Sequence, residues 1–179
     1  PEKALSTELG FRHRQSNWKL SLTLFQRDAK NYIDYVVLEG DERWQATNID
    51  QILSQGGELD IVINISSNKF AMGYAYLKDD VDGVSTALSR YAINSRKHHL
   101  FTRWTLKWSP YVTSSLSYRY SEQDSGYHYD VVDANIAFAK GRIKLLLSAH
   151  NILNAEYTEQ NLVPMPKGHA LLSLPYQLY

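Results

Sequence analysis

Histidine, tyrosine and aspartate side chains gather where two predicted strands begin, each after a long polar stretch. These residues are His98, His99, Tyr127, His128, Tyr129 and Asp130. Neutral imidazoles together with a carboxylate can hold zinc, and imidazole also binds the iron of haem. We therefore treat the six residues as candidate ligand-binding residues. The alternative is that they are ordinary polar residues of solvent-exposed strand ends, and the sequence leaves both interpretations open.

Two further groupings have the residue types of a site but not the spacing. Residues 79–83, Asp-Asp-Val-Asp-Gly, bring oxygen ligands together but lack the full calcium-loop spacing and its distal glutamate. Ser148, His150 and Asp133 have the residue types of a catalytic triad, yet no spacing motif links them. We therefore predict no catalytic residue, no resident metal and no intrinsic cofactor, and we do not expect an enzyme.

Alternation of apolar and polar residues runs through most of the chain and predicts strands. Leu59, Ile61 and Ile63, for example, face away from Glu58 and Asp60. The predicted strands lie at about 5–14, 18–33, 48–65, 70–76, 98–108, 115–120, 128–138, 143–149 and 170–178. The fold class is therefore all-β, an antiparallel meander of about nine strands.

The connections between these strands alternate between short and long. Tight turns are expected near residues 16, 67, 109 and 141, and longer polar connections at 37–42, 79–95, 122–127 and 157–168. Outer-membrane barrels have this asymmetry, with short turns on the periplasmic side and long loops outside the cell. The connections therefore favour a transmembrane β-barrel.

The apolar faces of the predicted strands carry almost no charge. Lys19, Asp60, Arg103 and Lys144 all fall on the opposite faces. Because a Lys or Arg on the lipid side of the mid-bilayer costs about 2–4 kcal/mol, this distribution agrees with lipid contact. Tyrosine and tryptophan near the strand ends fit two aromatic girdles. A soluble β-sandwich that binds a ligand or carbohydrate also alternates and remains an alternative.

The composition excludes several classes of function. The 179 residues have a formal net charge of zero, which gives no electrostatic case for nucleic acid. The absence of cysteine excludes disulfides and thiolate metal sites. No run of about 18 apolar residues predicts a membrane helix, and no signal peptide opens the chain at Pro1. We expect either a cytosolic protein or a piece of an exported one.

The number of predicted strands separates two barrel architectures. A complete eight-stranded outer-membrane barrel would fit 179 residues, but single-chain bacterial barrels have even strand numbers. Nine strands, with the first and last running toward the short turns, suit the C-terminal part of a larger barrel. The eight-stranded barrel remains a second alternative.

Several short motifs occur in an order that is informative. Residues 1–10 contain Pro-Glu and Glu-Leu-Gly, and residues 55–59 read Gln-Gly-Gly-Glu-Leu. Residues 151–157 read Asn-Ile-Leu-Asn-Ala-Glu-Tyr, and residues 163–166 read Val-Pro-Met-Pro. Over residues 1–179 this order resembles the C-terminal barrel region of TonB-dependent outer-membrane receptors. Two departures, Lys167-Gly168-His169 after Pro166 and Tyr179 at the end, leave the register of the last strand open.

The resemblance implies a barrel-wall fragment of a receptor for energy-coupled uptake of a scarce solute across the bacterial outer membrane. Such solutes are ferric siderophores, haem, cobalamin or metal complexes, so iron or another metal would arrive with the ligand. The implied partners are this extracellular small molecule, outer-membrane lipid, and TonB acting through an N-terminal plug expected outside these residues. A wall with two open edges is also expected to self-associate.

Overall fold

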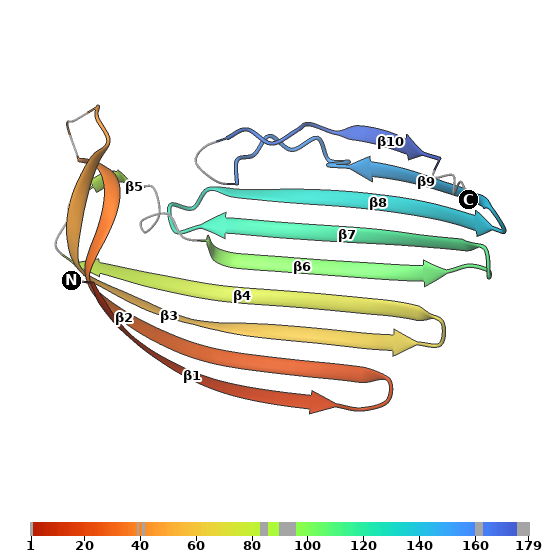
Figure 1. Ribbon diagram of the computed structural model, residues 1–179, viewed down its shortest axis with the longest axis horizontal. Coiled ribbons are helices and arrows are strands. Elements are labelled where there is room, and N and C mark those ends of the chain that lie inside the picture. Colours follow the sequence, from red (N-terminus) through yellow and green to blue (C-terminus); the bar gives the residue numbers. More distant parts are fainter. Residues whose placement is uncertain are drawn as a thin grey trace.

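One antiparallel sheet contains every strand that the structure describes. The computed structural model describes residues 2–38, 40, 42–82, 86–89, 96–159 and 163–174. The strands are β1 (Lys3–Arg14), β2 (Trp18–Leu38), β3 (Gln45–Ile65), β4 (Asn68–Asp82), β5 (Thr86–Ser89), β6 (Arg96–Lys107), β7 (Val112–Gln123), β8 (His128–Lys140), β9 (Ile143–His150) and β10 (His169–Ser173). Figure 1 shows them as a single layer with β1 and β10 at opposite edges.

The sheet is the predicted nine-stranded antiparallel meander with one additional short strand. Its order is β1-β2-β3-β4-β6-β7-β8-β9-β10, and β5 pairs with β2 outside this path. The turns after β1, β3, β6 and β8 lie at one end of the strands and the other connections at the opposite end (Figure 1). The predicted longer connection at 122–127 is only residues 124–127, as short as the turn between β6 and β7, because β7 continues to Gln123 and β8 begins at His128. In the described residues no second sheet packs on the first, and the sheet does not close on itself. The two-layer sandwich and the complete eight-stranded barrel are therefore not the architecture of this chain.

The prediction of a purely polar connection at residues 79–95 was wrong in part. β4 continues to Asp82, and β5 forms within the connection. β5 pairs with the far end of β2, where Val37 is opposite Leu88. β1 pairs with β2 only as far as Lys30, so the remaining edge of β2 offers free backbone groups to β5. β2 and β3 are also longer than predicted and run together as far as Val36 and Gln45.

The register of the strands divides their side chains between two faces. Directly opposed residues share a face, and one such row contains Trp18, Ile63, Phe70, Trp104 and Leu116. We call this side the apolar face. The neighbouring row contains Lys19, Val62, Ala71, Arg103 and Ser117 and belongs to what we call the polar face. The alternation read from the sequence is therefore preserved across the sheet.

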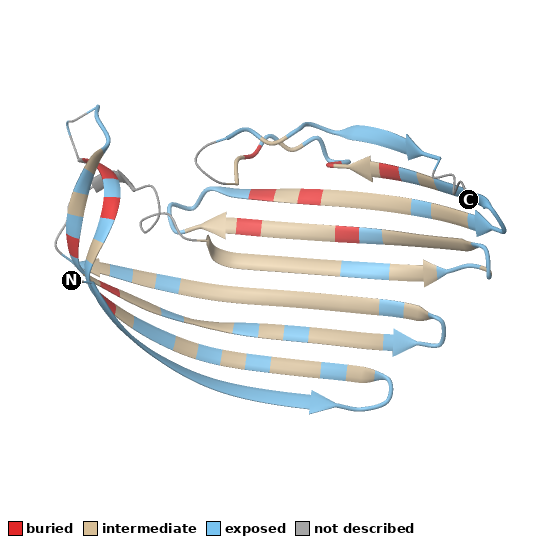
Figure 2. Cartoon of the chain, in the orientation of Figure 1, coloured by how far each residue is buried: buried red, intermediate tan, exposed pale blue. Residues whose placement is uncertain are grey.

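Much of the apolar face is uncovered. The buried positions are few and lie mainly toward the outer part of the β2–β3 hairpin and in β7, β8 and β9 (Figure 2). Leu9 on β1 is 73% exposed and Leu172 on β10 is 66% exposed. One buried group, Ile49 and Ile52, lies in the outer part of the β2–β3 hairpin, with Tyr32 and Val81 packed against it. The second buried group is Tyr129, Val131 and Tyr157, with Ala155 and Met165 packed against it. Tyr129 and Val131 lie on the polar face of β8.

The phase predicted for the last strand agrees with the structure as far as the described residues extend. Ala170 is opposite Ala149 and Leu172 is opposite Leu147, which places both on the apolar face. The predicted out-of-phase Tyr179 lies outside the described residues.

Candidate functional site

The six candidate residues do not converge on one point, because they lie on different faces of the sheet. One cross-strand row contains His98, Glu122 and His128, in register with Tyr76 of the apolar face. Asp130 lies on the same face, opposite Tyr120. A second row, containing His99, Ser121 and Tyr129, belongs to the polar face. Tyr127 precedes β8.

On the apolar face, the candidate residues contact tyrosines. The Tyr74 hydroxyl lies 2.8 Å from His98 Nδ1, and the Tyr76 ring centroid lies 5.2 Å from that of His98. The Tyr118 hydroxyl donates a hydrogen bond to Asp130. These residues form an aromatic and polar border at the long-connection end of the apolar face, which is the composition of a membrane interface.

On the polar face, three neighbouring side chains carry buried polar atoms that find no partner among the described residues. They are His99 Nε2, Ser121 Oγ and Tyr129 Oη. Ser121 is 1% exposed and Tyr129 is 5% exposed. A buried polar atom without a hydrogen bond costs free energy. These three buried polar atoms thus share one cross-strand row of the polar face.

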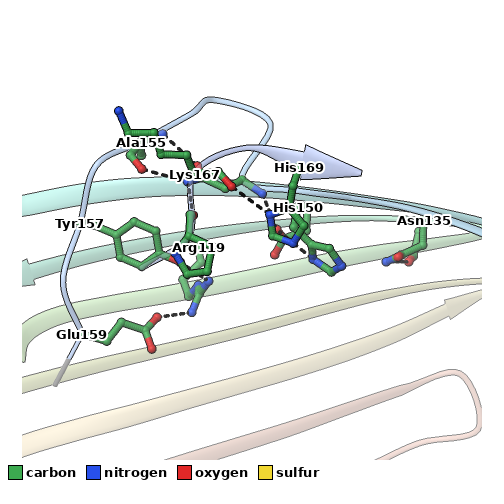
Figure 3. A network of polar contacts seen from close by, with 12 residues as sticks. Arg119, Asn135, His150, Ala155, Tyr157, Glu159, Lys167 and His169 are labelled. Carbon is green, nitrogen blue, oxygen red and sulfur yellow. Dashed lines mark hydrogen bonds and ion pairs between the residues drawn. The ribbon is translucent and has the colours of Figure 1, made fainter. Parts of the chain in front are cut away.

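The connection after β9 folds over the polar face beside this row (Figure 3). The Tyr157 ring stacks on the Tyr129 ring with centroids 4.5 Å apart. Arg119 Nη1 on β7 lies 2.5 Å from Glu159 Oε1, and its guanidinium carbon lies 5.9 Å from the Tyr157 ring centroid. Burial raises the pKa of the Tyr157 hydroxyl. The ion pair and the ring stack hold this connection against β7 and β8.

Asn151 shapes the start of the same connection. Its side-chain amide donates to the carbonyl oxygens of Ala155, at 2.9 Å, and Pro166, at 3.1 Å, while its Oδ1 accepts from the Ala155 amide at 2.9 Å. Asn151 and Asn154 have φ values of 48° and 53°, a region that asparagine enters more readily than most residues. The Asn151 side chain is thus a clamp that ties the backbone of Ala155 to that of Pro166.

A second contact closes this loop near its far end. Lys167 Nζ lies 2.6 Å from Glu156 Oε1, and this hydrogen bond lowers the pKa of the Glu156 carboxyl. The Tyr127 hydroxyl donates to the Glu156 carbonyl at 3.4 Å. Tyr127 therefore contacts the loop, and its ring centroid also lies 6.3 Å from that of Tyr129, another candidate residue.

The geometry limits the chemistry that is available here. Within the described part of the chain, no three His, Cys, Asp or Glu side chains come together to hold a metal ion. Asp133 Oδ1 lies 3.6 Å from His150 Nδ1. The same oxygen accepts a hydrogen bond of 2.9 Å from the backbone N–H of Asn151. The polar face offers hydrogen bonds, aromatic surface and a guanidinium, which are groups for recognition.

Sequence reasoning missed Arg119, Tyr157 and Glu159 as parts of this site. Arg119 and Glu159 are separated by 40 residues, so no local pattern joins them. The position of Tyr157 did carry a signal, because it ends the Asn-Ile-Leu-Asn-Ala-Glu-Tyr motif.

The comparison with protein families identifies this arrangement. The model "TonB dependent receptor-like, beta-barrel" matches residues 1–153. This chain belongs to the TonB-dependent receptor family. The resemblance read from the sequence motifs is thus confirmed, and the members of this family are transport receptors rather than enzymes. Among the described residues of this TonB-dependent receptor chain, no helix has the length and apolarity needed to cross a membrane.

Solved TonB-dependent receptor structures share the fold. The copper transporter OprC superposes with a TM-score of 0.78 at 15% identity, over 99% of this chain and 32% of that protein. The siderophore receptor PirA from Acinetobacter baumannii gives 0.73 at 14% identity, over 96% and 31%. The FrpB iron transporter from Neisseria meningitidis (F3-3 variant) gives 0.72 at 16% identity, over 98% and 30%.

This chain thus spans about a third of the length of these solved proteins. The search of curated proteins found no match.

Proposed function

We propose that this chain is the C-terminal part of the wall of a bacterial outer-membrane barrel that takes up a scarce solute. The observation that carries the proposal is the meander with two open edges and an uninterrupted apolar face. β1 and β10 each pair with one neighbour among the described strands, and Leu9 and Leu172 on these strands are mostly exposed. Open edges call for further strands, and an exposed apolar face calls for lipid.

The solute is a metal complex such as a ferric siderophore, haem or cobalamin, recognised on the polar face. Solved structures of the same fold carry the descriptions copper transporter, iron transporter and siderophore receptor, which supports this class. His99 and Tyr129, with unpartnered buried atoms, are the proposed contacts on the wall, and Tyr127 lies at the adjoining loop. His98, His128 and Asp130 border the lipid on the other face. Energy for uptake comes from TonB through a plug inside the barrel.

Binding and uptake assays on the receptor that carries this wall test the proposal. The purified receptor is titrated with ferric siderophores, haem, cobalamin and copper, and tryptophan fluorescence is recorded. Cells are then assayed for uptake of the bound compound with and without TonB. We expect one compound to bind and its uptake to stop without TonB. A receptor that binds none of them, or uptake that continues without TonB, would overturn the proposal.

Adjacent histidines provide a matched pair of variants for the same assay. His99→Ala removes a polar-face contact and should weaken solute binding by about tenfold, the equivalent of one hydrogen bond. His98→Ala removes the same side chain from the opposite face and should leave solute affinity unchanged. Equal effects of the two substitutions would contradict recognition on the polar face.

A further inference from the structure

A groove crosses the apolar face at Gly57. It has a volume of about 610 Å³, and it is lined by Leu22, Leu24, Leu59, Tyr74 and Tyr76, by Gln55 and Lys78, and by Gly56, Gly57 and Glu58 of β3. By register Gly56 and Glu58 belong to the polar face. In the register, Gly57 lies between Leu24 of β2 and Tyr76 of β4. Since glycine has no side chain, the floor of the groove at this point is the backbone of β3.

The two glycines of β3 have different surroundings. A Cβ atom on Gly56 would lie 2.3 Å from the Tyr76 carbonyl oxygen and 2.6 Å from the Phe25 ring, so that ring lies across Gly56 on the polar face. A Cβ atom on Gly57 would lie 3.0 Å from Leu24 Cδ2, the far end of a flexible side chain. Backbone packing therefore requires glycine at Gly56. At Gly57 an added Cβ atom would also lie 3.4 Å from the Thr23 carbonyl oxygen, and only the flexible Leu24 side chain would have to shift by a few tenths of an ångström.

The groove runs from the apolar band into its polar border. The row beyond Gly57 contains Gln26, Gln55 and Lys78, and Gln55 Nε2 donates to Gln26 Oε1 at 2.9 Å. From Gln55 to Leu59 the strand extends by roughly 13 Å. Tyr74 and Tyr76 form one wall, and tyrosine is typical of the level of the lipid head groups. One end of the groove thus lies at that level, and the other lies among apolar side chains.

Lys78 gives the polar end of the groove a positive charge. Its side chain is exposed and has no ion pair among the described residues. In the next row outward, Asp28 accepts a hydrogen bond from Gln51 at 2.7 Å, and Asp80 lies on the same face. Asp28 also lies 4.0 Å from Lys30 Nζ, one row further out. In the border row itself, which joins Thr7, Gln26, Gln55 and Lys78, the charged residue is Lys78, at the level where the phosphate of a lipid would lie.

We propose that this groove binds one membrane lipid with a net negative head group. An acyl chain lies over Gly57 between Leu24 and Tyr76, and the phosphate of the head group contacts the Lys78 ammonium. The inference rests on the proposed function, because the apolar face must lie in a membrane. It adds a particular lipid class and a particular place on the wall.

Native mass spectrometry of the detergent-purified receptor tests the site. The probes are phosphatidylglycerol and phosphatidylcholine with identical acyl chains. We expect the wild type to bind phosphatidylglycerol more tightly. Lys78→Gln should lower that affinity by about fivefold, the effect of one basic side chain at an anionic lipid surface, and leave phosphatidylcholine unchanged. Gly57→Leu should remove the bound molecule of both lipids by filling the groove.

Two control variants change the same face outside the groove. Lys30→Gln removes another exposed lysine, and Ala134→Leu adds a leucine in register with Leu116; neither should alter lipid binding. Equal affinities of the wild type for the two lipids, or unchanged phosphatidylglycerol binding by Lys78→Gln, would refute the lipid site. If the wild-type receptor inserts into vesicles but shows either of these two binding results, only the lipid site is refuted and the proposed function stands. If the wild-type receptor does not insert into vesicles, the proposed function itself is refuted.

Discussion

Arginine at the centre of the apolar face should destabilise the receptor far more than arginine one residue away. Ile61 lies midway between Gly57 and Ile65 on β3, with Leu20 and Met72 as cross-strand neighbours. An arginine at the bilayer midplane costs about 2–4 kcal/mol. We therefore expect Ile61→Arg to lower the folding equilibrium constant in vesicles by about thirty- to a thousandfold.

Val62→Arg is the matched control, because Val62 points to the polar face opposite Lys19 and Ala71. The like charge of Lys19 should cost less than about 1 kcal/mol. Both free energies of unfolding are measured by denaturant titration of the receptor in phosphatidylcholine vesicles, followed by tryptophan fluorescence. Equal costs for the two variants, or a larger cost for Val62→Arg, would refute the assignment of the faces.

Three further predictions concern the loop at residues 151–168. Asn151→Ala removes three hydrogen bonds and should destabilise the loop by about 2–3 kcal/mol, seen as faster proteolysis within it; a similar rate for Asn135→Ala, whose bond to Ser115 is 3.4 Å long, would count against the clamp. Gly168→Ala would place a Cβ atom 2.8 Å from the Asn151 carbonyl oxygen and should lower the free energy of unfolding by about 1–3 kcal/mol. The control Gly10→Ala would place its Cβ atom 4.0 Å from the Leu22 carbonyl oxygen and should avoid this clash. Equal losses of stability in the two variants would argue against the tight contact. Burial raises the pKa of Tyr157, so its contribution to stability should be complete below about pH 10, the ordinary tyrosine pKa, and should be lost as the pH rises through the raised value. Ultraviolet absorbance of tyrosinate follows this titration, and an unchanged titration curve for Tyr157→Phe would contradict it.

The alternation along the chain was enough to predict the strands and their faces where one side is apolar and the other polar. β3 from Leu59 to Ile65 and β10 around Leu172 are examples, since each apolar residue has the same environment. The prediction ended the second strand at about residue 33 and began the third at about 48, whereas β2 runs to Leu38 and β3 begins at Gln45. Val36, in the part that was missed, is buried within the hairpin itself. β5 was missed because its partner, β2, is not its neighbour in the sequence.

The candidate site was only partly predictable, for two separate reasons. The alternation that includes Leu100 already places His98 and His99 on opposite faces, so their separation could have been read from the sequence. The contact between Arg119 and Glu159 could not, because it depends on the path of an irregular loop. That path is set by the left-handed conformations of Asn151 and Asn154, which residue types alone do not specify.

The order of the meander makes a hairpin the unit in which such a wall can grow or shrink. If β6 and β7 were added or deleted together, every following residue would keep its place on the apolar or the polar face. Short turns and longer loops would also still alternate between the two ends of the strands. Changing a single strand would reverse the direction of every strand that follows. The hairpin of β2 and β3 is the exception, because its pairing with β5 ties it to the connection beyond β4. Evolution and protein engineering are therefore freer to vary the hairpins after β5 than those before it.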